Sequence, residues 1–417
     1  MSHPSAVSNP VLLITWVCIA HIFSMAGFSV FPTLLPQFSE LWQLSSGEAG
    51  TVSAAIFAGY TAAVPVLVTL TDRIDPRWIY LFSAILSAIG LVGFAQFADG
   101  MWSASIFHAL FGAGLGGTYM PGLKALGDHI EPRMISRATG FYTGCFSIGA
   151  AASYLFADVV YERSGWEMVY TISAIFSFLG GLIVFFVVPK SHPDQVPTPF
   201  RAMIRVFSNR STLTWSVCYG LHSWELFAFR AWSVAFLVFV GAQIAGGAEN
   251  SAMYAVLPPV TVAAIATLTG MPASILGNEL CIRYGRRLTV VAVMMFGAAS
   301  AVFTGGSAYL AYWIAVVAVL IYSTAIMSDS SALTAAAFAN ADRALRGATM
   351  AVHATIGFAG ASMGPVVFGL LLDAGGREAP EGWLYGFGFL ALLSFVSITL
   401  IKTLKPQSTA GDRDMGS

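Results

Sequence analysis

The strongest constraint on the fold is a series of long apolar segments, each long enough to cross a membrane as a helix. A membrane-spanning α-helix needs about 20 apolar residues, whereas a transmembrane β-strand needs about 10 residues of alternating polarity. The segments here are long and continuous, so we expect helices and not a β-barrel. Twelve helices are expected, at 11–36, 48–71, 78–97, 101–124, 136–159, 166–189, 211–239, 251–278, 288–304, 308–330, 345–372 and 383–403.

The composition excludes a soluble protein. Of the 417 residues, 57% are hydrophobic and 10% are charged, whereas about 25% of residues are charged in soluble domains. So few charges could not cover the surface of a soluble fold of this size. The formal net charge of −1 also gives no basic surface for nucleic acid. We therefore expect an all-α, multi-pass membrane protein.

Lysine and arginine are distributed unequally between the expected loops. Seventeen lie on one side, Arg163 and Arg377 lie on the other, and Arg230 lies inside a span. The seventeen are Arg73, Arg77, Lys124, Arg133, Arg137, Lys190, Arg201, Arg205, Arg210, Arg283, Arg286, Arg287, Arg343, Arg346, Lys402, Lys405 and Arg413. Because positively charged loops stay in the cytoplasm, we expect an inner-membrane protein with both termini cytoplasmic.

The longest cytoplasmic connection divides the chain into two sets of six helices. The expected parts are an N-terminal segment 1–10, a bundle 11–189, a middle loop 190–210, a bundle 211–403 and a tail 404–417. The halves repeat, because Arg73 and Arg77 after the second helix recur as Arg283 and Arg287 after the eighth, 210 positions later. A shared offset of half the chain length indicates an internal duplication.

These features resemble the major facilitator superfamily, whose loop signature after helices two and eight is roughly G-x-L-a-D-R-x-G-R-R. The matching residues are Leu70, Asp72, Arg73 and Arg77 in the first half and Leu280, Arg283, Gly285, Arg286 and Arg287 in the second. Three positions depart from the signature. In the first half Val68 replaces the first glycine and Asp75 replaces the second, and in the second half Ile282 replaces the acid. The resemblance implies that this loop tunes a conformational switch, so Asp72, Arg73, Arg77, Arg283 and Arg287 are expected to act there.

The resemblance also implies the general mechanism. Members of the family are secondary transporters, commonly monomeric, in which two six-helix bundles rock about a central site. In them helices one, four, seven and ten line the central cavity. Two marks of the proton/drug antiporters are missing here, because His108 replaces the usual arginine of helix four and no antiporter signature occurs within 144–153.

Ionisable residues inside the expected spans are candidates for the transport chemistry, because their burial in a bilayer is costly. They include His222, Glu225 and Arg230 in helix seven and His21 in helix one. A guanidinium binds anions with paired hydrogen bonds, so Arg230, together with His21 and Trp224, is predicted to bind the substrate. Glu225 and His222, three positions apart on one helix face, are predicted to couple protons.

Each of these residues also has a purely structural interpretation. An internal ion pair to another helix would hold the bundle together without any part in transport. His108 and His353 could likewise only bond a neighbouring helix. Lys124 and Asp329, at the inner ends of helices four and ten, are predicted to form a salt bridge that closes the cytoplasmic side. Alternatively, both face water.

Two short motifs resemble enzyme motifs but lack the right context. Gly112, Gly114 and Gly117 spell G-x-G-x-x-G, and residues 360–364 spell G-x-S-x-G, but both lie in apolar spans without a preceding strand. We interpret them as small residues that let membrane helices approach closely. With no metal-ligand or nucleotide-binding spacing, neither an enzyme nor a bound cofactor or metal is expected.

The sequence therefore predicts a secondary transporter that moves a small, anionic organic solute together with protons through the lipid bilayer. One alternative is efflux of hydrophobic, drug-like compounds by proton antiport, for which aromatic residues could line the cavity. The aromatic candidates are Phe28, Trp224, Phe227 and Phe229. A membrane-embedded enzyme or receptor on the same scaffold is a further alternative.

Overall fold

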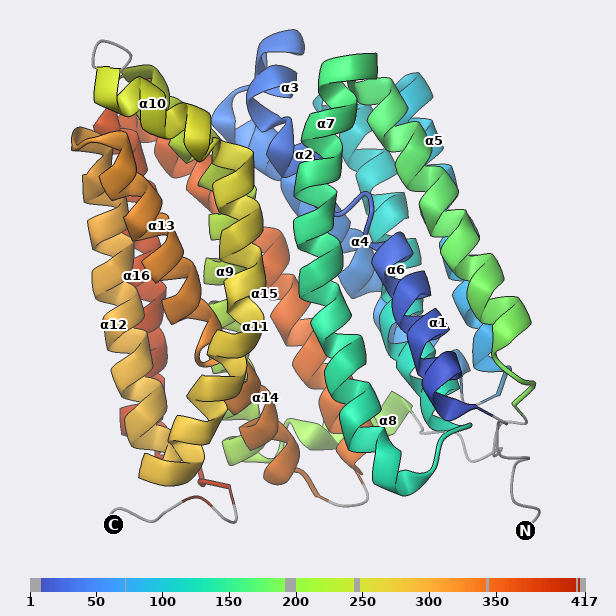
Figure 1. The fold of residues 1–417 in the computed structure, drawn as a ribbon. Helices are drawn as coiled ribbons and strands as arrows, with labels where there is room; N and C mark the ends of the chain where they lie inside the picture. The colour runs from blue at the N-terminus through green and yellow to red at the C-terminus, as the bar shows by residue number, and fades with distance from the viewer. Residues whose placement is uncertain are drawn as a thin grey trace. The chain divides into compact units, whose positions relative to one another are not determined.

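The computed structural model describes residues 9–71, 73–191, 200–243, 248–342, 345–409 and 412, and every regular element in these ranges is a helix. The α-helices are α1 Pro10–Ser24, α2 Val30–Thr33, α3 Leu35–Leu41, α4 Ser46–Leu70, α5 Pro76–Phe97, α6 Met101–Gly127, α7 Pro132–Val187, α8 Phe200–Val206, α9 Arg210–Gln243, α10 Ala248–Val256, α11 Pro259–Tyr284, α12 Arg286–Gly306, α13 Tyr312–Met327, α14 Ser330–Ala339, α15 Arg346–Gly375 and α16 Pro380–Leu404 (Figure 1). A single 3₁₀ turn, η1, covers Ser307–Tyr309.

The helices have the length and hydropathy of membrane spans. Within the described ranges, nine helical stretches are long and apolar enough to cross a membrane. One of them, in α7, contains two successive helices that meet at Gly165, whose φ of +79° breaks the helical backbone. With α1 to α3 and the 27-residue α6 added, the elements are consistent with the twelve expected spans.

The first expected span is interrupted. The sequence predicts one helix over 11–36, but α1 ends at Ser24 and the short helices α2 and α3 follow. Ser29 fixes the break, because its backbone N–H donates to Ser153 Oγ at 3.0 Å and its own Oγ donates to the Ala150 carbonyl at 2.9 Å. Pro36 adds to it, since proline has no N–H to continue the helical ladder.

Two later spans are also divided. The expected helix 251–278 becomes α10 and α11, which are separated at Pro258 and Pro259, two residues that cannot donate a backbone hydrogen bond. The expected helix 308–330 becomes η1, α13 and α14, because Leu310 is extended and the helix ends again before Asp329. Both differences come from local breaks inside apolar stretches.

The chain forms two compact units. One comprises Met1–Leu34 and Ala55–Thr198, and the other comprises Leu35–Ala54 and Pro199–Ser417. The division at Thr198 falls inside the predicted middle loop. The predicted bundle 11–189 differs from the first unit in one segment, since 35–54 groups with the second unit.

The start of α4 shows what holds segment 35–54 in the second unit. The backbone N–H groups of Ser46 and Gly47 each donate to the Asp373 carboxylate of α15 at 2.8 Å. A carboxylate at a helix N-terminus pairs with N–H groups that have no partner inside the helix. A Cβ on Gly50 would overlap the Pro365 carbonyl, so the two backbones are in close contact there.

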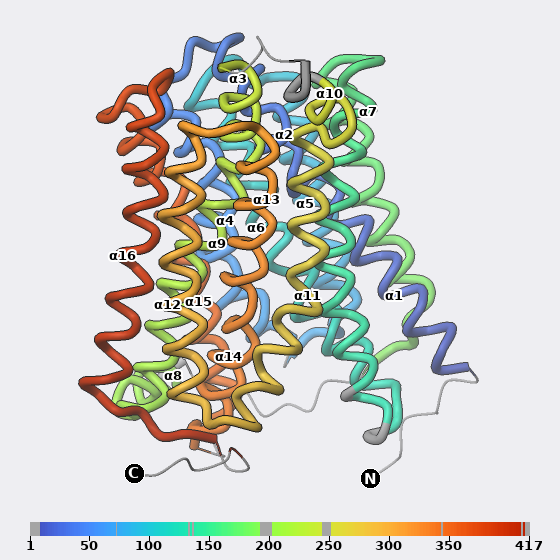
Figure 2. The backbone as a smooth tube through the Cα atoms, turned by 60° about the vertical axis from the view of Figure 1, so that its left-hand side comes forward, coloured from blue at the N-terminus to red at the C-terminus, as the bar shows by residue number. Residues whose placement is uncertain are grey.

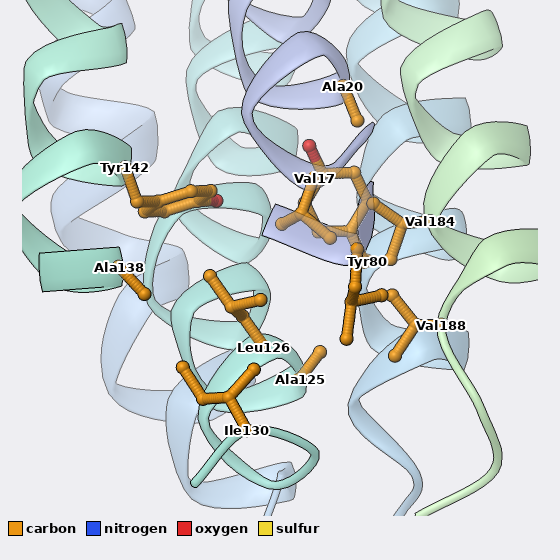
Figure 3. Close-up of a cluster of buried hydrophobic side chains, with 11 residues drawn as sticks. Val17, Ala20, Tyr80, Ala125, Leu126, Ile130, Ala138, Tyr142, Val184 and Val188 are labelled. Atoms are coloured by element: carbon orange, nitrogen blue, oxygen red, sulfur yellow. The ribbon is translucent and has the colours of Figure 1, made fainter. Parts of the chain in front are cut away.

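The core of the first unit lies where α1, α5, α6 and α7 meet. Figure 3 shows its side chains, with the Tyr142 ring extending from α7 toward the others. The cluster comprises Leu13, Val17, Ala20, Tyr80, Ala125, Leu126, Ile130, Ala138, Tyr142, Val184 and Val188. The Tyr80 hydroxyl lies 3.0 Å from Ser24 Oγ, and Tyr142 donates to the Thr118 carbonyl at 2.9 Å, so both buried hydroxyls are hydrogen-bonded.

The second unit is arranged around α9. Helix α9 packs against α15, while α11 and α13 lie side by side, as do α12 and α16, in both views (Figures 1 and 2). Its core cluster comprises Trp215, Cys218, Cys281, Val290, Met294, Ala332, Leu333, Ala336, Ala337, Ile398 and Ile401. This core lies next to the buried polar groups of α9.

The C-terminal tail packs on the second unit. Asp412 accepts hydrogen bonds from Arg286 Nε at 2.9 Å and from its terminal nitrogen Nη2 at 3.0 Å, and both side chains are almost fully buried. The Gln407 carbonyl accepts from Trp215 Nε1 at 3.0 Å. The tail therefore fixes the start of α12 to the start of α9.

Candidate functional site

A buried pair of ionisable residues lies in the second unit. His222 Nδ1 on α9 is 2.7 Å from Oδ1 of Asp329, the residue that precedes α14. The two residues are only 3% and 5% exposed. The contact is close in distance but is not aligned as a hydrogen bond, and Nε2 of His222 has no partner among the described residues.

Glu225 lies one helical turn from His222 and is also buried. Its Oε1 accepts a hydrogen bond from the Tyr322 hydroxyl at 2.9 Å, and its Oε2 accepts one from Ser394 Oγ at 2.9 Å. Tyr322 belongs to α13 and Ser394 to α16, so three helices meet at this carboxyl group. Both oxygens have donors, which a buried carboxylate needs.

His353 on α15 extends this group of polar residues. Its Nδ1 lies 3.2 Å from Ser216 Oγ, and its Nε2 lies 3.3 Å from Thr334 Oγ1. The Tyr219 ring stacks on His353 at 4.2 Å and on His222 at 5.7 Å, measured between ring centroids. We call His222, Glu225, Asp329 and His353 the polar cluster of the second unit.

The polar cluster can hold and exchange a proton. An imidazole and a carboxylate both bind protons, and a proton bound to either changes the charge of a buried site. Glu225 is a second carboxyl group one turn away. Within the described residues no group of three or more His, Cys, Asp or Glu has the arrangement of a metal site.

Arg230 and Trp224 lie on the same helix as the polar cluster. The Arg230 side chain is 7% exposed, and its guanidinium carbon lies 5.6 Å from the centroid of the Phe227 ring. Trp224 is partly exposed and contacts Phe389 at 6.0 Å between centroids. Its indole Nε1 has no partner among the described residues. A cation and an indole donor are thus both present on α9.

His21 is the buried ionisable residue of α1 in the first unit. It stacks on Tyr142, with ring centroids 4.6 Å apart and planes at 26°, and it lies 5.3 Å from Tyr119. Its exposure is 0%. Neither ring nitrogen has a hydrogen-bond partner within the described chain.

The two residues of the predicted cytoplasmic gate each have a partner in their own unit. Lys124 Nζ lies 3.5 Å from Asp128, four residues later, and both side chains are about one-third exposed. Asp329 contacts His222. The salt bridge between Lys124 and Asp329 stays a prediction.

The predicted switch residues differ in burial. In the first loop Arg77 is buried and pairs with Asp75 at 2.8 Å, while Arg73 is exposed. Arg77 also donates to the Val188 carbonyl at 3.1 Å, which joins the start of α5 to the end of α7. Asp72 lies outside the described residues.

In the second loop Arg283 is exposed and Arg287 is half-buried. The neighbouring Arg286 is the fully buried arginine, and its carboxylate partner is Asp412. Sequence reasoning singled out neither Arg286 as the buried position nor Asp412 as its partner, and it missed Tyr322 and Ser394 beside Glu225. The loop signature has an acidic residue at the position of Ile282. Its absence from this loop was the signal in the sequence that a buried arginine here needs a carboxylate from another part of the chain.

Comparisons with known proteins agree with this architecture. The sequence profile described as Major Facilitator Superfamily matches residues 17–262. A gentisate transporter from Corynebacterium glutamicum is 27% identical over 183 residues, which cover 43% of this chain and 40% of that protein. A probable 4-methylmuconolactone transporter from Cupriavidus pinatubonensis is 26% identical over 180 residues, which cover 41% and 40%. The chain therefore spans about 40% of the length of the curated relatives it matches.

A solved structure covers the whole fold. A bacterial homolog of the human lysosomal transporter Spinster superimposes with a TM-score of 0.78, covering 98% of this chain and 100% of that chain. The two sequences are 13% identical. This likeness shows the fold alone, and it confirms the predicted all-helical membrane architecture.

Proposed function

The chain belongs to the Major Facilitator Superfamily, and on that premise we propose that it carries a small organic acid across the membrane together with protons. It is a transporter and not an enzyme. Energy would come from the proton gradient, with two bundles exposing the binding site alternately to each side of the membrane. We expect a monomer in the inner membrane.

The buried contact between His222 and Asp329 is the observation that carries the proton coupling. Ionisable residues inside membrane spans are costly and mark proton pathways in transporters. A proton that binds here removes or adds one charge inside the second unit, and Glu225 offers a second site one turn away. His222 and Glu225 are thus the coupling residues that we propose, with Asp329 as a third.

An acidic cargo is supported by Arg230 and by the names of two relatives. A guanidinium inside a span attracts a carboxylate and binds it through paired hydrogen bonds. One relative is named for gentisate, an aromatic acid, and another for 4-methylmuconolactone. We extend this class of unsaturated or aromatic organic acids to the present chain, with Arg230, His21 and Trp224 as substrate-binding residues.

The conformational switch would connect to the proton site through Asp329. In our proposal Asp329 would also form the predicted salt bridge to Lys124, so gate and proton pair would share one carboxylate. In this proposal Asp72, Arg73, Arg77, Arg283 and Arg287 act in the basic loops that hold the helix ends.

The test separates substrate movement from proton coupling. The purified protein is placed in liposomes, and labelled gentisate is measured in two ways, as accumulation driven by an imposed pH gradient and as exchange without a gradient. Glu225→Gln and Asp329→Asn are expected to lose accumulation but keep exchange, because substrate binding survives without the proton site. Arg230→Ala is expected to weaken both by about tenfold or more, equivalent to about 1.4 kcal/mol of binding free energy.

Asp99→Asn is the matched control, since Asp99 is an exposed acid in the connection between α5 and α6. It is expected to leave both measurements unchanged. Gradient-driven accumulation that persists in Glu225→Gln and Asp329→Asn would refute the coupling site. Extrusion of hydrophobic cations, with no movement of organic acids, would instead establish the efflux alternative.

The orientation in the membrane can be tested on its own. Seventeen of the basic loop residues lie on one side of the expected spans and two lie on the other, which predicts that both termini are cytoplasmic. A fluorescent protein that folds only in the cytoplasm, fused after Ser417, is expected to fluoresce. A periplasmic alkaline phosphatase fused at the same position is expected to be inactive, and the reverse pattern would overturn this topology.

A further inference from the structure

His21 keeps hydrogen-bonding capacity that the described residues do not use. Its imidazole is fully buried, and Nδ1 and Nε2 both lack a partner within the described chain. His108 of the same unit is also buried, but its Nε2 lies 3.0 Å from the Tyr170 hydroxyl. Because a buried donor or acceptor without a partner is costly, His21 is a candidate for bonding a ligand.

Aromatic rings lead from His21 toward partly exposed positions. Tyr142 and Tyr119 contact the imidazole, and Tyr119 stacks on Tyr142 at 5.7 Å. Phe146 lies edge-on to Tyr119 at 6.4 Å and to Phe28 at 5.2 Å. Tyr119, Phe146 and Phe28 each keep part of their surface exposed. We call these five residues the ring cluster.

Within the ring cluster, His21 carries the ring nitrogens that make no hydrogen bond to the described residues. The Tyr142 hydroxyl donates to the Thr118 carbonyl at 2.9 Å, and the Tyr119 hydroxyl donates to Thr143 Oγ1 at 3.3 Å. Both tyrosine hydroxyls therefore use their protons inside the unit. Phe28 and Phe146 offer only ring surface.

We propose that the ring cluster is a subsite for a hydroxylated aromatic ring and that His21 bonds a ring hydroxyl. This inference rests on the proposed transport of organic acids and names the part of the substrate that the first unit recognises. A neutral imidazole has one donor and one acceptor, and a hydroxyl group is also both, whereas a carboxylate only accepts. The tyrosine and phenylalanine rings supply planar surface for stacking.

Binding of two probes to the full-length purified protein tests the subsite. Calorimetry compares 2,5-dihydroxybenzoate with benzoate, which lacks the hydroxyl groups. The wild type is expected to bind the hydroxylated acid about tenfold more tightly, a typical value for one good hydrogen bond. His21→Phe keeps a ring but removes both nitrogens, so it should weaken binding of the hydroxylated acid far more than binding of benzoate, and the preference should disappear. His21→Gln retains a donor and an acceptor and should keep part of the preference.

His108→Phe is the matched control, because it makes the same substitution at a buried histidine whose nitrogen already has a partner. It should keep the preference for the hydroxylated acid. Tyr119→Ala is a second variant that does not depend on the folding of His21→Phe, and it should weaken binding of both acids by similar factors. Unchanged affinities in Tyr119→Ala would overturn the subsite.

Two further outcomes distinguish this inference from the proposed function. If the wild type binds and accumulates both acids but His21→Phe keeps the preference, or loses both acids equally, the subsite is refuted and transport of organic acids stands. If the wild type neither binds nor moves any organic acid, the proposed function fails and the subsite fails with it.

Discussion

The contact of His222 with Asp329 is the residue-scale feature with the largest expected effect on stability. Each side chain is the polar partner of the other in a site that is almost fully buried. Removal of one partner of a buried pair leaves an unpaired polar or charged group and costs about 3–5 kcal/mol. Replacement of both partners is less harmful, because no group is then left alone.

We therefore expect Asp329→Asn and His222→Gln each to lower the melting temperature strongly, and the double variant to regain part of the loss. The measurement is thermal unfolding in detergent, arranged as a double-mutant cycle. A double variant whose loss equals the sum of the two single losses would show that the two side chains stabilise the protein independently.

His129 gives a prediction for pH at the residue scale. It lies in the connection between α6 and α7, where burial lowers its pKa below the ordinary value, while nearby Asp128 and Asp75 raise it and Arg77 lowers it. Below the ordinary pKa of about 6.5 the unfolded chain binds a proton that the folded protein binds less readily. Stability should therefore fall as the pH falls through this range. In His129→Gln the melting temperature should fall less between pH 8 and pH 5, and identical slopes would exclude this contribution.

At the scale of elements, close helix packing depends on glycine. The Gly112 backbone on α6 lies against the Ile56 carbonyl on α4, and a Cβ there would overlap it. Gly114 and Gly117 face α5 in the same way, at Ser83 and Ser87. The G-x-G-x-x-G pattern is thus a packing motif, as the sequence analysis predicted from its position inside an apolar span.

Alanine substitutions within α6 provide a matched pair. Gly112→Ala forces α4 and α6 apart and is expected to cost at least about 1–3 kcal/mol, the usual range for overpacking. Gly127→Ala at the end of the same helix meets nothing within 4 Å and should be neutral or slightly stabilising. Yield and melting temperature of the two variants check this. Equal behaviour would mean that α4 and α6 can separate without cost.

The C-terminal tail is the second prediction at this scale. Arg286 is buried and Asp412 supplies its carboxylate, so Asp412→Asn leaves a buried guanidinium without its counter-charge and should cost about 3 kcal/mol or more. Asp414→Asn removes the same charge two positions later and serves as the control. A melting temperature lowered equally in both variants would indicate a general charge effect, not this contact.

Apolar segments can be recognised without any knowledge of the whole molecule, and for this reason the helical membrane fold was predictable. Lengths, loop charges and the repeat of Arg73 and Arg77 at Arg283 and Arg287 all pointed to it. The breaks at Ser29 and Pro258 were harder to place, because a proline or serine inside an apolar run also occurs in continuous membrane helices.

The buried ionisable residues of the candidate site could be predicted from the sequence, but their contacts could not. His222 and Glu225 were found because ionisable groups in a span are rare. Their partners Asp329, Tyr322 and Ser394 lie about 100 residues or more away along the chain, and no local spacing in the sequence encodes such contacts. In helices that are apolar on all sides the sequence does not fix which face points inward, so the rotation of α9 had to come from the structure.

Contacts between distant parts of the chain can form only in the order in which those parts are synthesised. The N-terminus of α4 depends on Asp373, which lies 327 residues after Ser46. At a synthesis rate of roughly 5–20 residues per second, this carboxylate leaves the ribosome roughly 15–65 s after the helix that it caps. Throughout that interval the first turn of α4 must find other acceptors, such as water or lipid headgroups. The N-terminus of α4 therefore gains this cap only after α15 has been made.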